Sequence, residues 1–488
     1  MSDTPHEIII GLEVHVQLLT RTKLFCRCST QFGSPPNTQT CPICIGMPGT
    51  LPIMNRQAFA LALKAAVALS CKIPSSTKWD RKNYYYPDLP KGYQISQYDL
   101  PMSQAGHLEI SDPKDRFVAT RIGITRAHLE EDAGKSIHDE QAGRADSQID
   151  LNRTGTPLLE IVSEPDIRSP LEARAYLQEL KLLLTYLDVS DCNMQEGSLR
   201  VDANINLHIS SPEGKIATPI VEVKNMNSFR AVERALVYEV ERQYEVWKET
   251  HQKLGGVPKQ TRGWDEAAQV TRPQRSKEES SDYRYFPDPD LVPVTTTPEQ
   301  VERVRDGLGE LPAAMRKRLQ QTHGITPCDA EVLVNQGRRL VDYYVKVAER
   351  CGDGKLAGNW VQQAVLRTLN ETQVGIDQFP ISAAHLGELL EAIGQRRLDS
   401  SRGRDVFGEM LSSGKSAAEV MERMGIQQVD ESELVGLCEE LLAANPKTVA
   451  DLKAGKTKAV GVLIGQAKKR NPNVDPGRVR EICLNLVQ

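Results

Sequence analysis

The sequence predicts an α+β protein, in which an antiparallel β-sheet domain is followed by two all-helical domains. Alternating Val/Ile-rich segments recur in the first half of the chain, whereas only short helical segments with Gly and Pro breaks follow Pro298. The length of 488 residues exceeds one ordinary core. We therefore expect a sheet domain over residues 1–295, a helical domain over 296–410 and a small helical tail domain over 411–488.

Hydrophobic periodicity predicts the elements of the first domain. Period-two alternation is typical of half-buried strands, and capping signals such as Ser169-Pro170 and Asn227-Ser228 mark where helices begin. Strands are expected at 8–18, 117–125, 158–162, 199–209 and 219–224. Helices are expected at 57–71, 171–188 and 229–254.

The sequence excludes several classes of protein. Met1–Glu7 lacks the features of a signal peptide, and no apolar run reaches the roughly 18 residues of a membrane span, so we expect a cytoplasmic protein that contacts no membrane. Gly134-Lys-Ser136 and Gly414-Lys-Ser416 lack the upstream glycine of a Walker A loop. No GxSxG elbow or Gly/Ser-rich amidase stretch is present either. The chain is therefore not expected to supply an amidase nucleophile.

Net charge is distributed unevenly along the chain. The whole chain carries −5, but Asn445–Gln488 contains nine Lys and Arg against three Asp and Glu, which gives this end +6. An acidic body with a basic end indicates a metal or nucleotide site joined to a module that contacts a polyanion such as RNA. A solvated helical surface is the alternative interpretation.

Several predicted strands place charged and amide side chains on the face opposite their apolar residues. These residues are Glu13, His15, Glu160, Arg200, Asp202, Asn204, Glu222 and Lys224. Such a face can hold Mg·ATP, because phosphoryl transfer mainly requires positioning and charge neutralisation. Arg200, Asp202, Asn204, Glu222 and Lys224 are therefore candidate contacts for substrate or nucleotide. A solvated outer face of the sheet is the alternative.

The segment His128–Asp132 adds three consecutive carboxylates to this pattern. Carboxylates this dense raise one another's pKa or bind a cation, and Glu and Asp oxygens with one His suit Mg²⁺. In a strand only one of Glu130 and Glu131 can share a face with its neighbours. The sequence alone does not decide between these two residues.

Four of the ten cysteines form two close pairs separated by a turn-rich loop. Cys26, Cys28, Cys41 and Cys44 fit a closed, tetrahedral, structural zinc site, so a zinc knuckle is expected at 26–44. Four reduced thiols and a redox CxxC are the alternatives.

Seven ordered motifs within the first ~290 residues resemble the tRNA-phosphorylating component, GatB, of the aspartyl/glutamyl-tRNA amidotransferase family, and the helical remainder is similar in layout. The motifs are Ile10-Gly-Leu-Glu-Val-His15, Asp80-Arg-Lys-Asn-Tyr-Tyr-Tyr-Pro-Asp88, Gly92-Tyr-Gln-Ile-Ser-Gln97, His128-Leu-Glu-Glu-Asp-Ala-Gly-Lys135, Leu151-Asn-Arg-Thr-Gly-Thr-Pro-Leu-Leu-Glu-Ile-Val-Ser-Glu-Pro-Asp166, Glu196-Gly-Ser-Leu-Arg-Val-Asp-Ala-Asn204 and Ser281-Asp-Tyr-Arg-Tyr-Phe-Pro287.

The resemblance implies a ligase component that uses ATP to phosphorylate the side-chain carboxylate of Glu on tRNA(Gln) or Asp on tRNA(Asn). Ammonia from a separate amidase (GatA) component then displaces the phosphate, and a small third component (GatC) completes a heterotrimer. It also implies a cradle of antiparallel strands related to glutamine synthetase and a helical tail that grips tRNA. The cognate charging synthetase is a further candidate partner.

The same resemblance assigns residues of the site. The Mg²⁺ centre falls on His15, Glu131 and Glu160, with Glu13 and Glu130 close by. The motif thus favours Glu131 over Glu130 as the metal ligand.

Lys82 and the tyrosines from Tyr84 to Tyr86 are candidates for lining the ammonia route or meeting the aminoacyl end of the tRNA. A packed Tyr/Pro loop is the alternative.

Two other functions compete with this hypothesis. A non-enzymatic RNA-binding scaffold requires none of the carboxylates. A free-standing ligase that acts on a small acid requires no tRNA.

Overall fold

The computed structural model describes residues 5–138, 147–211, 214–274, 283–426, 430–454, 456–471 and 473–487. The chain forms two compact units, Met1–Pro312 and Ala313–Gln488. The first unit extends past residue 295 because helix α4 (Pro298–Asp306) packs against helix α1 (Arg56–Ala68). The mixed class is confirmed, with a mainly antiparallel sheet followed by helices.

A nine-stranded sheet organises the first unit, and strand β1 (His6–Gln17) runs through its middle. Its strands follow the order β14-β13-β12-β10-β1-β9-β6-β5, with β11 beside β10. Only the β12–β13 pair of this sheet is parallel among the described strands. The other bounds are β5 Ser103–Ile110, β6 Thr120–Glu131, β9 Pro157–Ser163, β10 Leu199–Ser211, β11 Gly214–Ala217, β12 Val221–Lys224, β13 Gln260–Asp265 and β14 Val270–Pro273.

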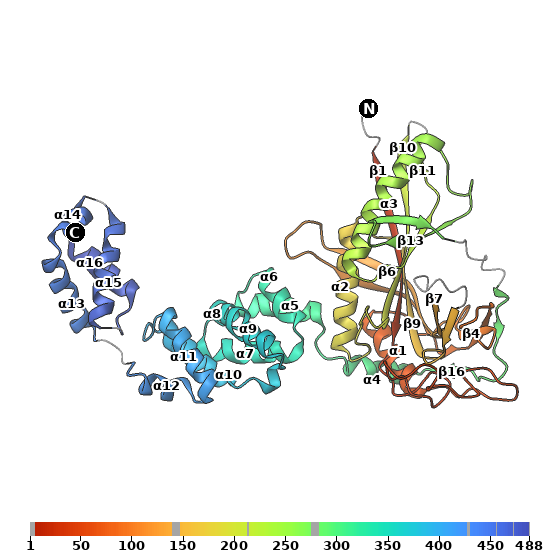
Figure 1. The fold of residues 1–488 in the computed structure, drawn as a ribbon, viewed down its shortest axis with the longest axis horizontal. Coiled ribbons are helices and arrows are strands. Elements are labelled where there is room, and N and C mark those ends of the chain that lie inside the picture. The colour runs from red at the N-terminus through yellow and green to blue at the C-terminus, as the bar shows by residue number, and fades with distance from the viewer. Residues whose placement is uncertain are drawn as a thin grey trace. The chain divides into compact units, whose positions relative to one another are not determined.

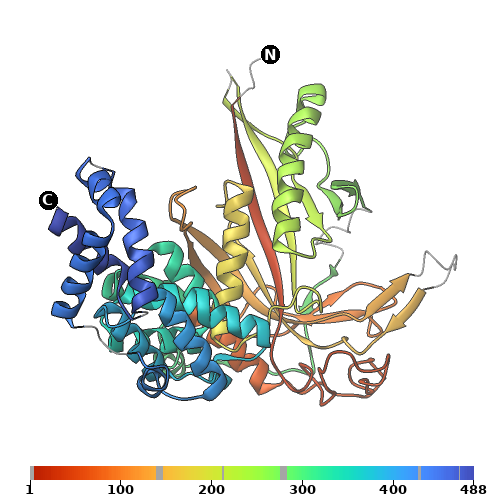
Figure 2. The ribbon, with the colours of Figure 1, turned by 60° about the vertical axis from the view of Figure 1, so that its left-hand side comes forward.

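Helices cover the apolar face of this sheet, as the views in Figures 1 and 2 show. Helix α2 (Pro170–Tyr186) contacts α3 (Phe229–Thr250) and β5, while α1 contacts β5 and β6. Each helix begins where predicted, because the side chains of Asn55, Ser169 and Ser228 accept hydrogen bonds from first-turn N–H groups. The core between sheet and helices includes Ile10, Leu12, Val14, Val16, Leu61, Tyr176, Leu180 and Val232.

Small sheets lie beside the large one. Strand β3 (Asp80–Asn83) pairs with β4 (Tyr93–Ser96) and β15 (Phe286–Pro287), and β4 contacts β6. The remaining pairs are β2 Ser76–Thr77 with β16 Val294–Thr295, and β7 Lys135–His138 with β8 Ser147–Asp150.

Two sequence expectations differ from the observed sheet. The strand predicted at 117–125 is β6, which begins at Thr120 and continues to Glu131, so the carboxylate segment is itself strand. The stretch 255–295 also contains strands β13 to β16, because its polar side chains hid the alternation. Ser281 and Asp282 of the last motif lie outside the described residues.

The second unit is helical throughout its described part, and a short π-helix (Val361–Val365) joins α8 to α9. Its helices are α5 Pro312–His323, α6 Pro327–Asn335, α7 Arg338–Cys351, α8 Gly354–Trp360, α9 Leu366–Thr372, α10 Ala383–Gly394, α11 Ser400–Ser413, α12 Ala417–Arg423, α13 Glu431–Ala444, α14 Pro446–Lys453, α15 Val460–Arg470 and α16 Pro476–Val487, with 3-10 turns at Ile376–Gln378 and Thr457–Ala459. No helix in the described ranges combines the length and the hydropathy that a membrane crossing requires.

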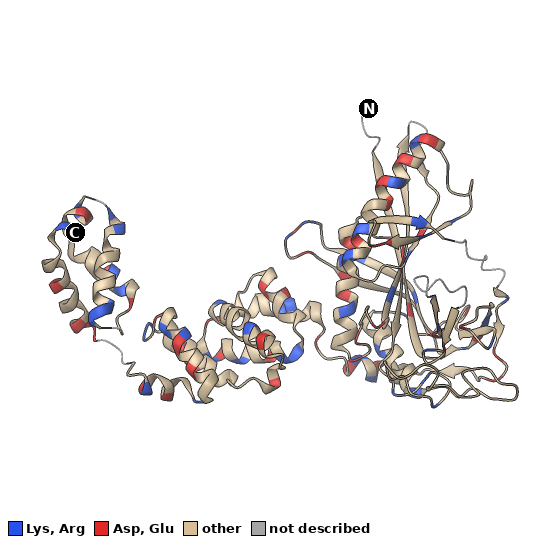
Figure 3. Cartoon of the chain, in the orientation of Figure 1, with Lys and Arg blue, Asp and Glu red and all other residues tan. Residues whose placement is uncertain are grey.

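The last hydrophobic core begins at α13, whereas α12 contacts α10 and α11. This compact tail, Asp430–Gln488, contains nine Lys and Arg and eight Asp and Glu. Figure 3 shows both signs of charge on these helices. The acidic helix α13 therefore offsets most of the positive charge counted from residue 445 onward.

Candidate active site

The polar face of the sheet carries a row of four side chains that lie opposite one another on adjacent strands. Across β1, His15 pairs with Arg200 on one side and with Glu160 on the other, and Glu160 pairs with His128 of β6. Such directly opposite residues are the nearest side-chain neighbours in an antiparallel sheet. The register therefore brings together residues that lie far apart in sequence.

Glu130 completes the cluster, since it lies two residues after His128 and points to the same face. The Nε2 atom of His15 lies 3.5 Å from Oε2 of Glu160 and 3.7 Å from Oε1 of Glu130. One ligand atom each from His15, Glu130 and Glu160 can lie within 4.8 Å of one another. Two carboxylates and one imidazole at this spacing fit an ion that keeps additional water and phosphate ligands, as Mg²⁺ does.

The electrostatics of the cluster favour a cation. Burial and the charge of Glu160 raise the pKa of Glu130. Although burial alone raises the pKa of Glu160, His128 and His15 lower it well below its usual range. Burial lowers the pKa of His128 to about 4, so its imidazole is neutral at physiological pH. A bound divalent cation relieves the repulsion between the two carboxylates.

Glu131 does not join this cluster, which differs from the placement implied by the family resemblance. Its side chain projects from the other face of β6, where Oε2 pairs with Nζ of Lys91 and accepts a hydrogen bond from the backbone N–H of Ile95 at 3.0 Å. Glu130 takes the place beside His15 and Glu160 because strand alternation separates adjacent residues onto opposite faces.

Lys82 and Tyr84 lie beside the cluster, on and just after β3. The Nζ atom of Lys82 is 5.0 Å from the ring centre of Tyr283 and 5.9 Å from that of Tyr84. Its positive charge also lowers the pKa of both Glu130 and Glu160. The Tyr84 hydroxyl donates to Oε1 of Gln94 at 3.1 Å, whereas Tyr85 is exposed.

A second acidic group lies next to the first on the same face. Ligand atoms of Glu13, Asp202 and Glu222 can lie within 4.8 Å of one another. Lys224 already supplies a positive charge there, since its Nζ pairs with Asp202 and lies 3.4 Å from Oε1 of Glu222. Asn204 donates from Nδ2 to Oε1 of Glu13 at 2.9 Å. The structure thus brings these predicted residues together as an ion-pair network.

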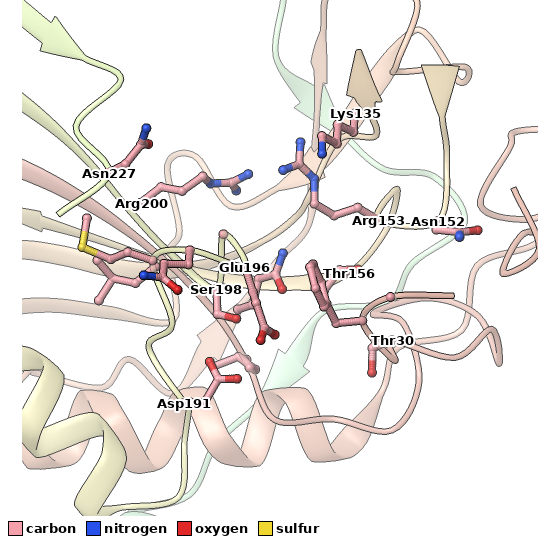
Figure 4. A pocket seen from close by; sticks show the side chains of 18 of the residues that line it. Thr30, Lys135, Asn152, Arg153, Thr156, Asp191, Glu196, Ser198, Arg200 and Asn227 are labelled. Carbon is pink, nitrogen blue, oxygen red and sulfur yellow. The ribbon is translucent and has the colours of Figure 1, made fainter. Parts of the chain in front are cut away.

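A pocket of about 590 Å³ adjoins the row at Arg200. Figure 4 shows Arg153, Arg200 and Lys135 gathered on one side of it, with Asp191 and Glu196 on another. Lys224 and Asp202 also line the pocket. It therefore offers concentrated positive charge beside the carboxylate cluster, which is suited to an anion.

The four cysteines of the knuckle converge as predicted. Their Sγ atoms all lie within 4.8 Å of one another, and those of Cys41 and Cys44 are 3.9 Å apart. Four sulfurs at 2.3 Å from a tetrahedral zinc lie roughly 3.8 Å apart, so the donor set fits the metal. Lys23 is fully buried with its Nζ 3.7 Å from Sγ of Cys44, which provides positive charge beside the thiolates.

Comparisons with known proteins agree with this geometry. A family model described as the GatB/GatE catalytic domain matches residues 8–302, and one described as the GatB domain matches residues 342–486. The chain belongs to the GatB/GatE family. This membership makes it one component of a glutamine-hydrolysing amidotransferase, which is a carbon–nitrogen ligase.

Similar proteins cover nearly the whole chain. A Rhodopirellula baltica protein is 59% identical over 99% of this chain and 97% of its own length, and a Moorella thermoacetica protein is 47% identical over 98% of both chains. A Geotalea daltonii protein is 47% identical over 99% of both. Each is named as the B-type subunit of aspartyl/glutamyl-tRNA(Asn/Gln) amidotransferase.

Sequence reasoning omitted three residues that the structure places at the site of this GatB/GatE chain. His128 lies in the central row, while Arg153 and Asp132 lie beside the pocket. The period-two pattern could have identified His128, because His128 and Glu130 share a face once β6 is extended. No local pattern marks Arg153, which follows the loop after β8.

Proposed function

We propose that this GatB/GatE chain phosphorylates the side-chain carboxylate of Glu on tRNA(Gln), of Asp on tRNA(Asn), or of both, with Mg·ATP as phosphoryl donor. Ammonia from a glutaminase partner then attacks the acyl phosphate and releases phosphate to leave the amide. Phosphorylation is needed because a carboxylate is a poor electrophile, and the acyl phosphate supplies a leaving group.

One observation carries this proposal: His15, Glu130 and Glu160 converge on the sheet beside a pocket that carries Arg153 and Arg200. When bound, Mg²⁺ neutralises charge on the phosphate oxygens. His15, Glu130 and Glu160 would hold that ion, and Lys82 would stabilise charge nearby. Glu13, Asp202 and Lys224 form an adjacent network that can orient the substrate.

Other parts of the proposal concern assembly. The amidase component and the small third component would complete a cytoplasmic heterotrimer, in which the tail helices contact tRNA. The first unit would be a cradle of the glutamine-synthetase type. The knuckle would hold a structural zinc through Cys26, Cys28, Cys41 and Cys44, because four cysteine ligands leave no open position for chemistry.

Reconstitution tests the proposal directly. The chain is combined with its amidase and small third component, Mg²⁺, ATP, glutamine and Glu-tRNA(Gln), and the release of ADP and the formation of Gln-tRNA(Gln) are both measured. ADP release that requires the charged tRNA is expected. With ammonium chloride replacing glutamine, the amide should still form without glutamine hydrolysis, because this chain needs only ammonia.

The same assay separates the competing functions. ADP release with free glutamate in place of charged tRNA would indicate a free-standing ligase. Binding of tRNA with no ATP turnover in any combination would indicate an RNA-binding scaffold and contradict the proposal.

A further inference from the structure

The inference concerns Asp132, a buried carboxylate shared by two arginines of the pocket. Its Oδ1 accepts a hydrogen bond from Nη2 of Arg200 at 2.9 Å, and its Oδ2 lies 3.5 Å from Nε of Arg153. Gln17 also donates from Nε2 to Oδ2 at 2.9 Å. The carboxylate side chain is only 3% exposed. Asp132 itself does not line the pocket, so it acts on the pocket through the two arginines.

The two arginines are held in place but keep open sides. Arg153 donates from Nε to the carbonyl of Ala133 at 2.9 Å and from Nη2 to that of Gly134 at 2.5 Å. The side chains of Arg153 and Arg200 are about one-third exposed, at 32% and 33%. Within the described part of the chain, Nε and Nη1 of Arg200 and Nη1 of Arg153 make no hydrogen bond.

The charge balance favours an anion at this position. One carboxylate faces two guanidinium groups, so a net positive charge remains on the side of the pocket where Figure 4 also places Lys135. Guanidinium groups fixed in orientation bind phosphate oxygens through parallel N–H groups. A preorganised pair binds more tightly than a mobile pair, because less side-chain freedom is lost on binding.

The location selects which phosphates are meant. Arg200 lies directly opposite His15, and His15 lies opposite Glu160, so the cationic side of the pocket borders the candidate metal ligands. Phosphoryl transfer requires the transferred group to meet the metal and the cations together. The acceptor carboxylate would approach from another side of the same cluster.

We infer that Asp132 is a positioning residue that fixes Arg153 and Arg200 to receive the phosphate chain of ATP in this pocket. This inference rests on the proposed function, since it concerns the same ATP-dependent step. It assigns the pocket to the nucleotide and not to the aminoacyl end of the tRNA.

The test compares Asp132→Asn with wild type in the reconstituted complex. Asparagine keeps the shape of the side chain but removes the charge that aligns both arginines. The KM for ATP should rise at least about tenfold, the equivalent of losing one charge-assisted hydrogen bond, while the KM for Glu-tRNA(Gln) stays within about twofold. The conservative variant Asp132→Glu should recover part of the loss.

Glu239→Gln is a matched control. Glu239 is also a fully buried carboxylate shared by two arginines, Arg242 and Arg262, and none of the three lines this pocket. This variant should lower stability without changing the KM for ATP. Equal KM changes in Asp132→Asn and Glu239→Gln would reduce Asp132 to a structural role and overturn the inference.

Arg153→Gln covers the case in which Asp132→Asn does not fold, since Arg153 is partly exposed and its loss leaves Asp132 paired with Arg200. It should also raise the KM for ATP. Inorganic triphosphate should compete with ATP in wild type and less effectively in either variant. A rise in the KM for Glu-tRNA(Gln) with an unchanged KM for ATP would assign the pocket to the aminoacyl end and contradict the inference.

Direct binding separates this inference from the proposed function. ATP binding to the complex, measured by calorimetry with Mg²⁺ present, should weaken in Asp132→Asn even if the complex shows no tRNA-dependent turnover. In that outcome the pocket assignment stands and the proposed reaction fails. Turnover with ATP affinity equal in both proteins gives the reverse result.

Discussion

At the scale of single residues, the chemistry of the site depends on which of two adjacent glutamates faces the metal. Glu130 lies beside His15, whereas Glu131 pairs with Lys91 on the opposite face of β6. The two residues have the same side chain, so only the face of the strand assigns them different roles. Substitutions at the two positions should therefore fail in different ways.

Glu130→Gln should abolish most of the ATP-dependent step. The amide cannot supply the negative charge that the cation requires, so the rate of tRNA-dependent ADP release should fall by about 10²–10³-fold. The midpoint of unfolding should change little, because burial already raises the pKa of Glu130. Glu109→Gln is the control, since Glu109 is exposed on β5. Activity within about twofold of wild type in Glu130→Gln would contradict the assignment.

Glu131→Gln should instead lower stability. The side chains of Lys91 and Glu131 are only 6% and 4% exposed, so removing the carboxylate leaves a buried ammonium without its partner. The free energy of unfolding of the first unit should fall by about 3–5 kcal/mol, measured by urea denaturation. The double variant Lys91→Met with Glu131→Gln should be more stable than Glu131→Gln alone. Equal stabilities of the single and double variants would contradict a buried ion pair.

At the scale of elements, the knuckle is built against the floor of the site. A Cβ atom placed on Gly155 would lie 3.5 Å from Oε1 of Glu131 and 3.7 Å from both Cβ of Cys44 and Cδ of Lys23. Gly155 also has φ +82°, a conformation that favours glycine. The knuckle thus packs close to β6 through a position with no room for a side chain.

Metal analysis of the purified complex should find about one zinc per chain, held by the four cysteines. Cys41→Ser should lose the zinc and lower the unfolding midpoint of the first unit, while the KM for ATP changes little. Cys328→Ser, at an exposed single cysteine, is the control. Full zinc content in Cys41→Ser would exclude the four-cysteine site.

At the scale of the whole molecule, the tail combines its own core with a nearly balanced charge. Arg470 pairs with Glu440 and Arg478 with Glu431, so basic side chains of α15 and α16 meet acids of α13. Exposed basic residues without such ion pairs in the described ranges are Lys447, Lys453, Lys458, Lys469 and Arg480. These five define the surface from which contacts to tRNA phosphates are expected.

Ending the chain after Ile426 should weaken tRNA binding and leave the packing of α12 on α10 and α11 intact. The dependence of affinity on salt should also become shallower, by about 0.7–0.9 in logarithmic slope for each lost phosphate contact. Binding is measured at several salt concentrations, beside a full-length variant with the five exposed basic residues changed to Gln. Unchanged affinity in both proteins would mean that the tail is a solvated surface.

The sequence by itself determined most of what depends on local pattern. Period-two alternation identified β1, β9, β10 and β12, and cap residues such as Ser169 and Ser228 located the starts of helices. The spacing of the cysteines identified the knuckle, and the ordered motifs identified the family. All of these are short-range signals, which a linear sequence retains.

Tertiary structure alone decided the register and the neighbours across it. The pairing of β1 with β9 and β10 sets His15 between Glu160 and Arg200, and the extent of β6 selects Glu130 over Glu131. The sharing of Asp132 by Arg153 and Arg200 joins segments from three parts of the chain. The physical reason is that strand pairing and buried charge compensation depend on long-range packing, and no local pattern encodes which distant residues will meet.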